Sequence, residues 1–150
     1  MLTRDEICRL IPHRDPFLWI DEVIEESGNA LVALKFIPPD LDVFRGHYPG
    51  RPVLPGVLLC EAAMQAGAVL IARQGLTPGE AGAWRPADRV PVATRINNVK
   101  FRQLVRPGDT LEIAVELTER LADAFFLSAT IKVAGKTAAR LEFACTLASA

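Results

Sequence analysis

The sequence predicts an α+β domain in which one long buried helix packs against an antiparallel sheet of about six strands. The helix is indicated by residues 54–74, an apolar stretch in which Glu61 is the only charged residue before Arg73. A helix without a polar face has to be enclosed by other elements. The sheet is indicated by strand-like segments before and after this stretch. Because one helix enclosed by one sheet is the simplest packing of these parts, we expect residues 1–150 to form a single domain.

The N-terminal part predicts a short helix followed by a hairpin. Thr3 and Glu6 form a capping box that starts a helix, and Pro12 requires the helix to end before it. Residues 17–26 and 30–37 are strand-like and flank a Ser-Gly-Asn turn sequence.

Turn residues divide the rest of the chain. Pro55 suits the first turn of a helix over about 54–74, and residues 75–88 are rich in Gly and Pro and predict a surface loop. A Pro107-Gly108 pair predicts a type II turn, and Gly135-Lys136 predicts a two-residue hairpin turn. The four later strand-like segments are residues 90–105, 109–120, 123–135 and 136–149.

Composition excludes several classes of protein. A net charge of −1 gives no general attraction to nucleic acid or to an anionic membrane. Cys8, Cys60 and Cys145 are odd in number and far apart, so we expect neither a disulfide framework nor a zinc site, and we expect a reducing compartment. Charges near the N-terminus disfavour a secretory signal, and Glu61 and Gln65 disfavour a membrane span. These observations predict a cytoplasmic protein that binds neither nucleic acid nor membrane.

The stretch GHYPGRPVLPGVLLCEAAMQAG, residues 46–67, carries the candidate chemistry. Its glycines and prolines constrain the loop around His47, and an imidazole held in one place suits a general base. The alternative is a structural histidine. His13 is the only other histidine, and it lies where the first helix meets the first strand. A packing or hydrogen-bonding role is favoured there over catalysis.

Glu61 is the candidate acid, because buried carboxyl groups in apolar clefts are enriched at functional sites. The alternative is a glutamate that pairs with an arginine from elsewhere in the chain. Gln65 lies one turn further along the helix and can hydrogen-bond the carboxyl group.

Gly56 can offer its N–H to a carbonyl oxygen that gains negative charge, or it can simply permit tight packing. Cys60 points about 100° away from Glu61 on a helix, which favours a small buried hydrophobe over a nucleophile.

Three segments of the chain resemble the β-hydroxyacyl-(acyl carrier protein) dehydratases of type II fatty acid synthesis. They are IPHRDPFLWIDEV, GHYPGRPVLPGVLLCEAAMQAG and NNVKFRQLVRPGDTLEI. Glu61 and the Gly50-Arg51-Pro52 triplet match the simple dehydratase branch of that family rather than the bifunctional dehydratase/isomerase branch. Asp15 departs from the pattern, which usually has an aromatic residue after His-Arg. The resemblance implies the hot-dog fold, a long helix wrapped by an antiparallel sheet.

The resemblance also implies a reaction and its residues. A 3-hydroxyacyl thioester would lose water to give a trans-2-enoyl thioester, with His47 as the base and Glu61 as the acid. Gly56 would bind the thioester carbonyl, and Gln65 would belong to the same substrate site. His47 and Glu61 would come from different subunits of a homodimer, which can assemble further into a trimer of dimers. The resemblance implies no metal or redox cofactor, and it implies a substrate that is carried on the phosphopantetheine of an acyl carrier protein.

Two other functions stay open on this sequence. One is a thioesterase or an enoyl-thioester hydratase on the same fold, and the other is a non-catalytic acyl-binding subunit. A cluster of cations bears on the partner: Lys100, Arg102 and Arg106 lie within seven residues. On a strand their even spacing would put them on one face. That face is either a solvated sheet edge that resists aggregation or a docking patch for an acidic carrier protein.

Overall fold

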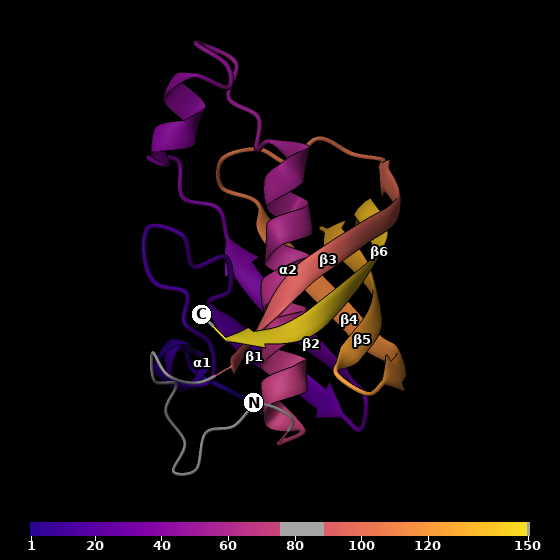
Figure 1. Ribbon diagram of the computed structural model, residues 1–150. Helices are drawn as coiled ribbons and strands as arrows, with labels where there is room; N and C mark the ends of the chain where they lie inside the picture. The colour runs from indigo at the N-terminus through magenta and orange to yellow at the C-terminus, as the bar shows by residue number, and fades with distance from the viewer. Residues whose placement is uncertain (76–88, 150) are drawn as a thin grey trace.

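A computed structural model describes residues 1–75 and 89–149 (Figure 1). The helical elements are α1 (Arg4–Leu10), a 3₁₀ turn η1 (Asp42–Arg45) and α2 (Gly56–Arg73). The strands are β1 (Glu22–Ser27), β2 (Ala30–Phe36), β3 (Arg89–Phe101), β4 (Thr110–Leu121), β5 (Ala124–Val133) and β6 (Lys136–Ser149). The predicted fold class, one long helix against an antiparallel sheet of six strands, is confirmed.

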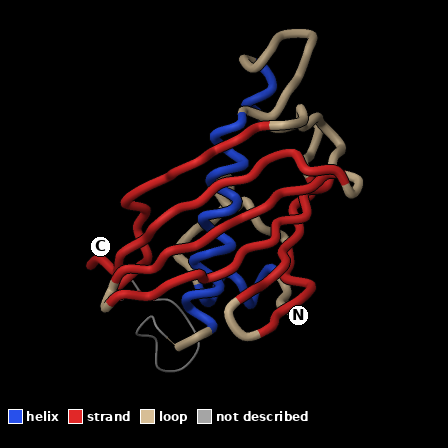
Figure 2. Tube along the Cα trace, turned by 90° about the vertical axis from the view of Figure 1, so that its right-hand side faces the viewer, coloured by secondary structure: helices blue, strands red, loops and turns tan. Residues whose placement is uncertain are grey.

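The six strands form one antiparallel sheet in the order β1-β2-β4-β5-β6-β3. The sheet curves across helix α2, as the tube in Figure 2 shows. Strand β3 is not beside β4, its successor in the sequence, but pairs with β6 and ends the sheet. The turn before β4 has the predicted position, because Asp109 N–H donates to Arg106 O at 3.1 Å. One edge of β3 therefore has no neighbouring strand among the residues described.

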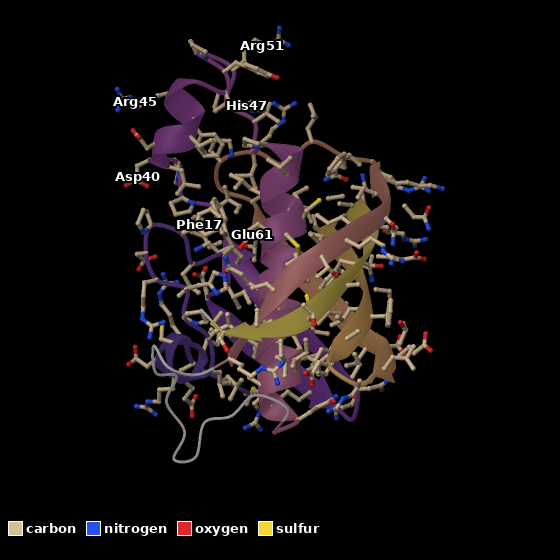
Figure 3. All side chains as sticks on the ribbon, in the orientation of Figure 1. Phe17, Asp40, Arg45, His47, Arg51 and Glu61 are labelled. Atoms are coloured by element: carbon tan, nitrogen blue, oxygen red, sulfur yellow. The ribbon has the colours of Figure 1, made fainter. Side chains whose placement is uncertain are left out.

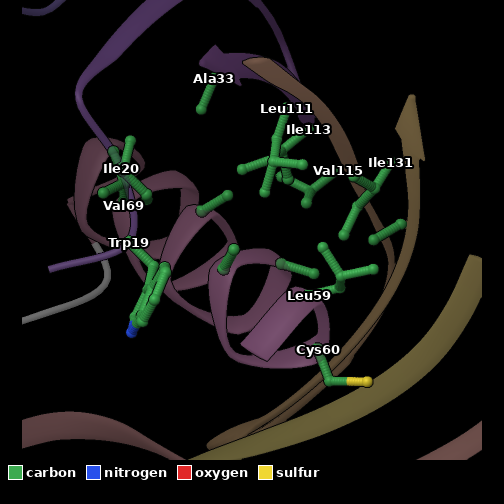
Figure 4. Packing of buried hydrophobic residues seen from close by; sticks show 14 of the residues in the cluster. Trp19, Ile20, Ala33, Leu59, Cys60, Val69, Leu111, Ile113, Val115 and Ile131 are labelled. Atoms are coloured by element: carbon green, nitrogen blue, oxygen red, sulfur yellow. The ribbon is translucent and has the colours of Figure 1, made fainter. Parts of the chain in front are cut away.

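Helix α2 is the centre of the hydrophobic core. Figure 4 shows Leu59 of this helix on the side of the buried sheet residues and Val69 beside Ile20, all in one buried cluster. Gly67 permits this close packing, because a Cβ at that position would lie 2.8 Å from the Phe143 ring. The helix is long and apolar enough to pass for a membrane span, yet 61% of its residues are buried inside the protein. It is the interior helix of this fold.

Helix α1 begins as its capping box predicts. Thr3 is the N-cap, and its side chain accepts from the Glu6 backbone while the Glu6 side chain accepts from the Thr3 N–H. The helix ends at Leu10, two residues before Pro12. Ile7 is its fully buried side chain and anchors it to the core.

Several predicted positions were wrong by a few residues or lie outside the described part. The first strand begins at Glu22 rather than at 17, because backbone groups of Phe17 and Trp19 bond to a side chain of α2 instead of to a strand. Helix α2 begins at Gly56, with Pro55 as its N-cap residue rather than in its first turn. The last hairpin turns at Ala134-Gly135, one residue earlier than predicted. Most of the predicted loop over 75–88 falls on residues that the structure does not describe.

Candidate active site

The loop that carries His47 is held by its own backbone. His47 N–H donates to Val43 O at 3.0 Å, and Val53 N–H donates to His47 O at 3.0 Å. The imidazole Nδ1 lies 2.7 Å from Val53 O. Because a carbonyl oxygen can only accept, the proton of the neutral ring is on Nδ1 and the Nε2 lone pair is free. The ring also stacks on Tyr48, with 4.1 Å between the ring centroids.

His47 and Gly56 line one cavity of about 790 Å³. Its wall is largely apolar and includes Val57, Phe101 and Leu104. Arg51 and Arg106 also line it and are exposed to solvent. The cavity thus combines a proton acceptor, a helix N-terminus and an apolar lining, which suits an acyl group with a polar head.

Gly56 is the first residue of α2. N–H groups in the first turn of a helix have no intrahelical acceptor and lie at the positive end of the helix dipole. Across the described residues, no hydrogen bond from Gly56 N–H is formed. A Cβ here would lie 2.8 Å from the Phe101 ring, so glycine is required for packing. The packing reason for this glycine is therefore shown, and carbonyl binding by its N–H stays a prediction.

Glu61 lies one turn and a half further along α2, on the side that the sheet leaves partly open. Figure 3 shows His47 beside the start of the helix and Glu61 farther along it, near Phe17. The Glu61 side chain is 20% exposed. No arginine or lysine forms an ion pair with it in the described part of the chain, so the structure gives no support to the arginine alternative.

Gln65 holds the Glu61 side chain in place. Its Nε2 donates to Glu61 Oε1 at 2.9 Å, as the spacing of one helical turn predicts. The same amide donates to Phe17 O at 2.9 Å, and its Oε1 accepts from Trp19 N–H at 2.8 Å. Because Gln65 is 1% exposed and all these partners have fixed positions, the direction of the Glu61 carboxyl group is also fixed.

A second side chain reaches the Glu61 carboxyl group. His13 Nε2 lies 3.6 Å from Glu61 Oε1, and the His13 side chain is 26% exposed. Burial lowers the pKa of His13, the Glu61 charge opposes this, and Arg14 adds to the lowering. Sequence reasoning favoured a packing role for His13 and missed this neighbour. Nothing in the local sequence reports a contact between residues so far apart.

Glu61 does not line the cavity that holds His47. Around Glu61, the uncovered face of α2 presents Val57, which is 70% exposed, and the half-buried Leu58 and Met64. A single chain therefore brings His47 and Gly56 together in one cavity and leaves Glu61 outside its lining, although Val57 belongs both to the cavity and to the Glu61 face of α2.

The thiols near Glu61 are not poised for nucleophilic chemistry. Burial raises the pKa of Cys60, and burial together with the Glu61 charge raises the pKa of Cys145 to about 11. A thiol attacks as the thiolate, which such an environment disfavours. Both cysteines are buried and unpaired, in agreement with the expectation that Cys60 is a small hydrophobe.

The three predicted docking cations do not share one strand face. Strand β3 ends at Phe101, so Lys100 lies on the strand while Arg102 and Arg106 follow it. Lys100 and Arg102 line a hollow of about 410 Å³ together with Arg140. Arg106 lines the cavity of His47 instead. The prediction of one shared strand face was wrong, because the chain leaves the sheet before reaching Arg106.

Comparisons with known proteins identify the family of this chain. A FabA-like domain matches residues 11–142. The 3-hydroxyacyl-[acyl-carrier-protein] dehydratase FabZ of Anaeromyxobacter dehalogenans (strain 2CP-1) is 40% identical over 143 residues, covering 95% of this chain and 88% of the relative. The FabZ of Rickettsia bellii (strain OSU 85-389) is 39% identical over 139 residues, covering 92% of this chain and 90% of the relative.

A solved structure shares the architecture. The dehydratase heterocomplex ApeI:P from Xenorhabdus doucetiae superposes with a TM-score of 0.63 at 24% identity, covering 83% of this chain and 94% of the matched chain. This likeness bears on the fold and agrees with the hot-dog arrangement expected from the sequence. The matched domain contains the His47 loop, helix α2 and the whole of strands β1 to β5. The chain therefore belongs to the FabA-like family.

Proposed function

We propose that this protein removes water from 3-hydroxyacyl thioesters carried on an acyl carrier protein, giving trans-2-enoyl thioesters for fatty acid or related acyl-chain synthesis. The observation that carries the proposal is the hydrogen bond between His47 Nδ1 and Val53 O. It leaves a basic Nε2 in an apolar cavity beside the N-terminus of α2. The names of the FabZ relatives, which share about two fifths of their residues with this chain over most of its length, support the same reaction.

Each group has a part in the elimination. His47 Nε2 takes the C2 proton, and the electron pair of that C–H bond forms the C2=C3 double bond. The C3–O bond breaks as Glu61 donates a proton to the hydroxyl group, which leaves as water. Gly56 N–H donates to the thioester oxygen, which gains negative charge as the C2 proton leaves. The reaction ends with protonated His47 and ionised Glu61, and exchange of a proton with solvent restores both. None of these steps needs a metal or a redox cofactor.

A second copy of the chain completes the site in this proposal. Glu61 does not line the cavity of the His47 in its own chain, so the base of one protomer would act with Glu61 of the partner subunit. Two exposed apolar features support association. The free edge of β3 carries Val92 and Ile96, which are 38% and 43% exposed, and the Glu61 face of α2 carries Val57. Unpaired strand edges with apolar side chains are covered in stable proteins. We infer at least a homodimer, which can assemble into a trimer of dimers.

The acyl carrier protein is the proposed partner, and the cations around the cavity would receive it. Arg51 and Arg106 line the cavity and are exposed, while Lys100 and Arg102 line a second hollow. An acidic carrier approaching this side would meet positive charge before its phosphopantetheine arm enters the apolar cavity. The free thiols agree with a reducing, cytoplasmic location, where such carriers would work.

The proposed reaction is tested with a 3-hydroxyacyl pantetheine thioester and the purified protein. Dehydration gives a conjugated enoyl thioester, which absorbs in the ultraviolet, and leaves no free thiol. A thioesterase would release free thiol without the absorbance change. A non-catalytic subunit would give neither signal across a series of chain lengths. Thiol release without the absorbance change, or the absence of both signals, would overturn the proposal. The same chain-length series would show which acyl groups the cavity prefers.

A further inference from the structure

His13 lies in a position to act on Glu61. It comes from the segment between α1 and β1, and its Nε2 is 3.6 Å from Glu61 Oε1. This distance is longer than a hydrogen bond. Contacts of this kind in unliganded sites tighten when the reacting group is bound.

The backbone around His13 is fixed by the neighbouring guanidinium. Arg14 donates to the carbonyl oxygens of Ile11 and His13 at 2.8 and 2.7 Å, and to that of Cys8 at 2.7 Å. Asp15 accepts from Arg4 of α1, which ties down the next residue of the segment. The imidazole thus has a defined place beside α2, because the chain on which it is carried is bonded on both sides.

The surroundings of the ring select one tautomer. His13 Nδ1 is buried and has no hydrogen-bond partner within the described residues. A buried N–H without an acceptor leaves a donor unsatisfied, and an imidazolium would place such an N–H on Nδ1. The proton of a neutral ring is therefore on Nε2, the ring nitrogen that lies 3.6 Å from Glu61 Oε1. The lowered pKa of His13, caused mainly by burial, agrees with a neutral ring.

Two N–H groups then converge on the same oxygen of Glu61. Gln65 Nε2 lies at 2.9 Å and His13 Nε2 at 3.6 Å from Oε1. An oxygen that accepts from Gln65 and faces a second N–H is a poor place for a proton, so the proton that Glu61 donates in the proposed reaction would be on Oε2. A cation in place of His13 would favour the carboxylate and remove the proton that the reaction requires. A neutral donor orients the acid without this penalty.

We propose that His13 is a positioning residue for Glu61, supplying a neutral N–H to Oε1 so that the carboxyl proton is on Oε2, toward the departing hydroxyl group. The inference rests on the proposed dehydration, in which Glu61 is the acid. In this proposal His13 does not touch the substrate. It determines which oxygen of Glu61 touches the substrate. Among the described residues, two further groups bear on the Glu61 carboxyl: Gln65 of the same helix donates to it, and its charge helps to raise the pKa of the Cys145 thiol of β6.

Two matched variants test this role. His13→Phe keeps the ring volume and removes the N–H, whereas His13→Gln keeps a neutral N–H at about the position of Nε2. We expect His13→Phe to lower kcat roughly tenfold, the lower end of what loss of an orienting partner costs, with KM unchanged. His13→Gln should recover most of the lost turnover. Thermal unfolding of both variants separates a change in stability from a change in turnover.

A second arm measures the coupling to Glu61. In a Glu61→Gln background, His13→Phe should cause no further loss, because the group that it positions no longer donates a proton. Wild-type turnover in His13→Phe, or an equal loss in His13→Phe and His13→Gln, would overturn the inference and leave the proposed dehydration standing. A wild-type protein without dehydratase activity would instead overturn the proposed function.

Discussion

His47 Nδ1 lies 2.7 Å from the carbonyl oxygen of Val53, six residues away on the far side of a tight loop. This contact decides the tautomer of the imidazole, and the tautomer decides whether Nε2 can accept a proton. With the proton held on Nδ1, Nε2 is a base that faces a cavity rather than a donor. The proposed reaction depends on this orientation, because an acid and a carbonyl-binding N–H have to meet the same substrate.

Replacing His47 by alanine should lower turnover by at least about a hundredfold, as loss of a general base does. Glu61→Gln should do the same, because an amide keeps the shape of the side chain and cannot donate the required proton. Enoyl formation is measured under saturating substrate, and circular dichroism checks that each variant is folded. Near-native turnover in either variant would show that the assigned acid and base are wrong.

Gln65→Leu should lower both stability and turnover. It leaves the Trp19 N–H and the Phe17 carbonyl without their partner, and it frees the Glu61 carboxyl group. Unfolding in urea should show a loss of about 1–3 kcal/mol, the usual cost of leaving a buried group such as the Trp19 N–H unsatisfied. Met64→Leu, one position away and close in volume, is the control and should stay near the wild type. Equal small effects in both variants would contradict the role given to Gln65.

Gly56→Ala should destabilise the protein, because the new Cβ would lie 2.8 Å from the Phe101 ring. We expect a loss of about 1–3 kcal/mol in the free energy of unfolding, the usual cost of an overpacked contact. Gly46→Ala is a matched control, since a Cβ there meets nothing within 4 Å. Adding Phe101→Ala to Gly56→Ala should restore part of the stability. Equal stability of Gly56→Ala and Gly46→Ala would show that the close contact with Phe101 is not the reason for glycine at position 56.

Charge reversal of Lys100 and Arg102 together should raise KM for carrier-bound substrate roughly tenfold by weakening electrostatic steering. A short pantetheine thioester should be unaffected, and the difference should shrink as salt rises. Lys136→Glu, an exposed cation at the β5–β6 turn, is the control. Equal loss on both substrates would mean that these residues support the pocket rather than the carrier.

Most of the fold followed from the sequence because its signals are local. The capping box at Thr3, the apolar run of α2 and the alternation of the late strands each report on neighbouring residues. The first strand was predicted too early because residues 17–21 have the composition of a strand. Their backbone groups are used by Gln65, a partner that lies more than forty residues away.

The site was predictable in its residue types and not in its geometry. The rigid loop marked His47, and a lone charge in an apolar helix marked Glu61. The contact of His13 with Glu61 and the separation of Arg106 from Lys100 depend on how distant segments fold together. The even spacing of the cations implied a strand that in fact ends at Phe101, so the spacing alone could not place them.

The central claim is that His47 of one protomer acts with Glu61 of the partner subunit, and mixing two inactive variants tests it most directly. His47→Ala and Glu61→Gln protein are unfolded together, refolded at equal amounts and assayed for dehydration. In a mixed two-fold dimer one site then has both defects and the other has neither, so about a quarter of wild-type activity should return if subunits pair at random. Sedimentation confirms that the mixture is dimeric or larger. If each site were built within one chain, every site in the mixture would lack its base or its acid, and no activity above that of the separate variants would contradict the shared site.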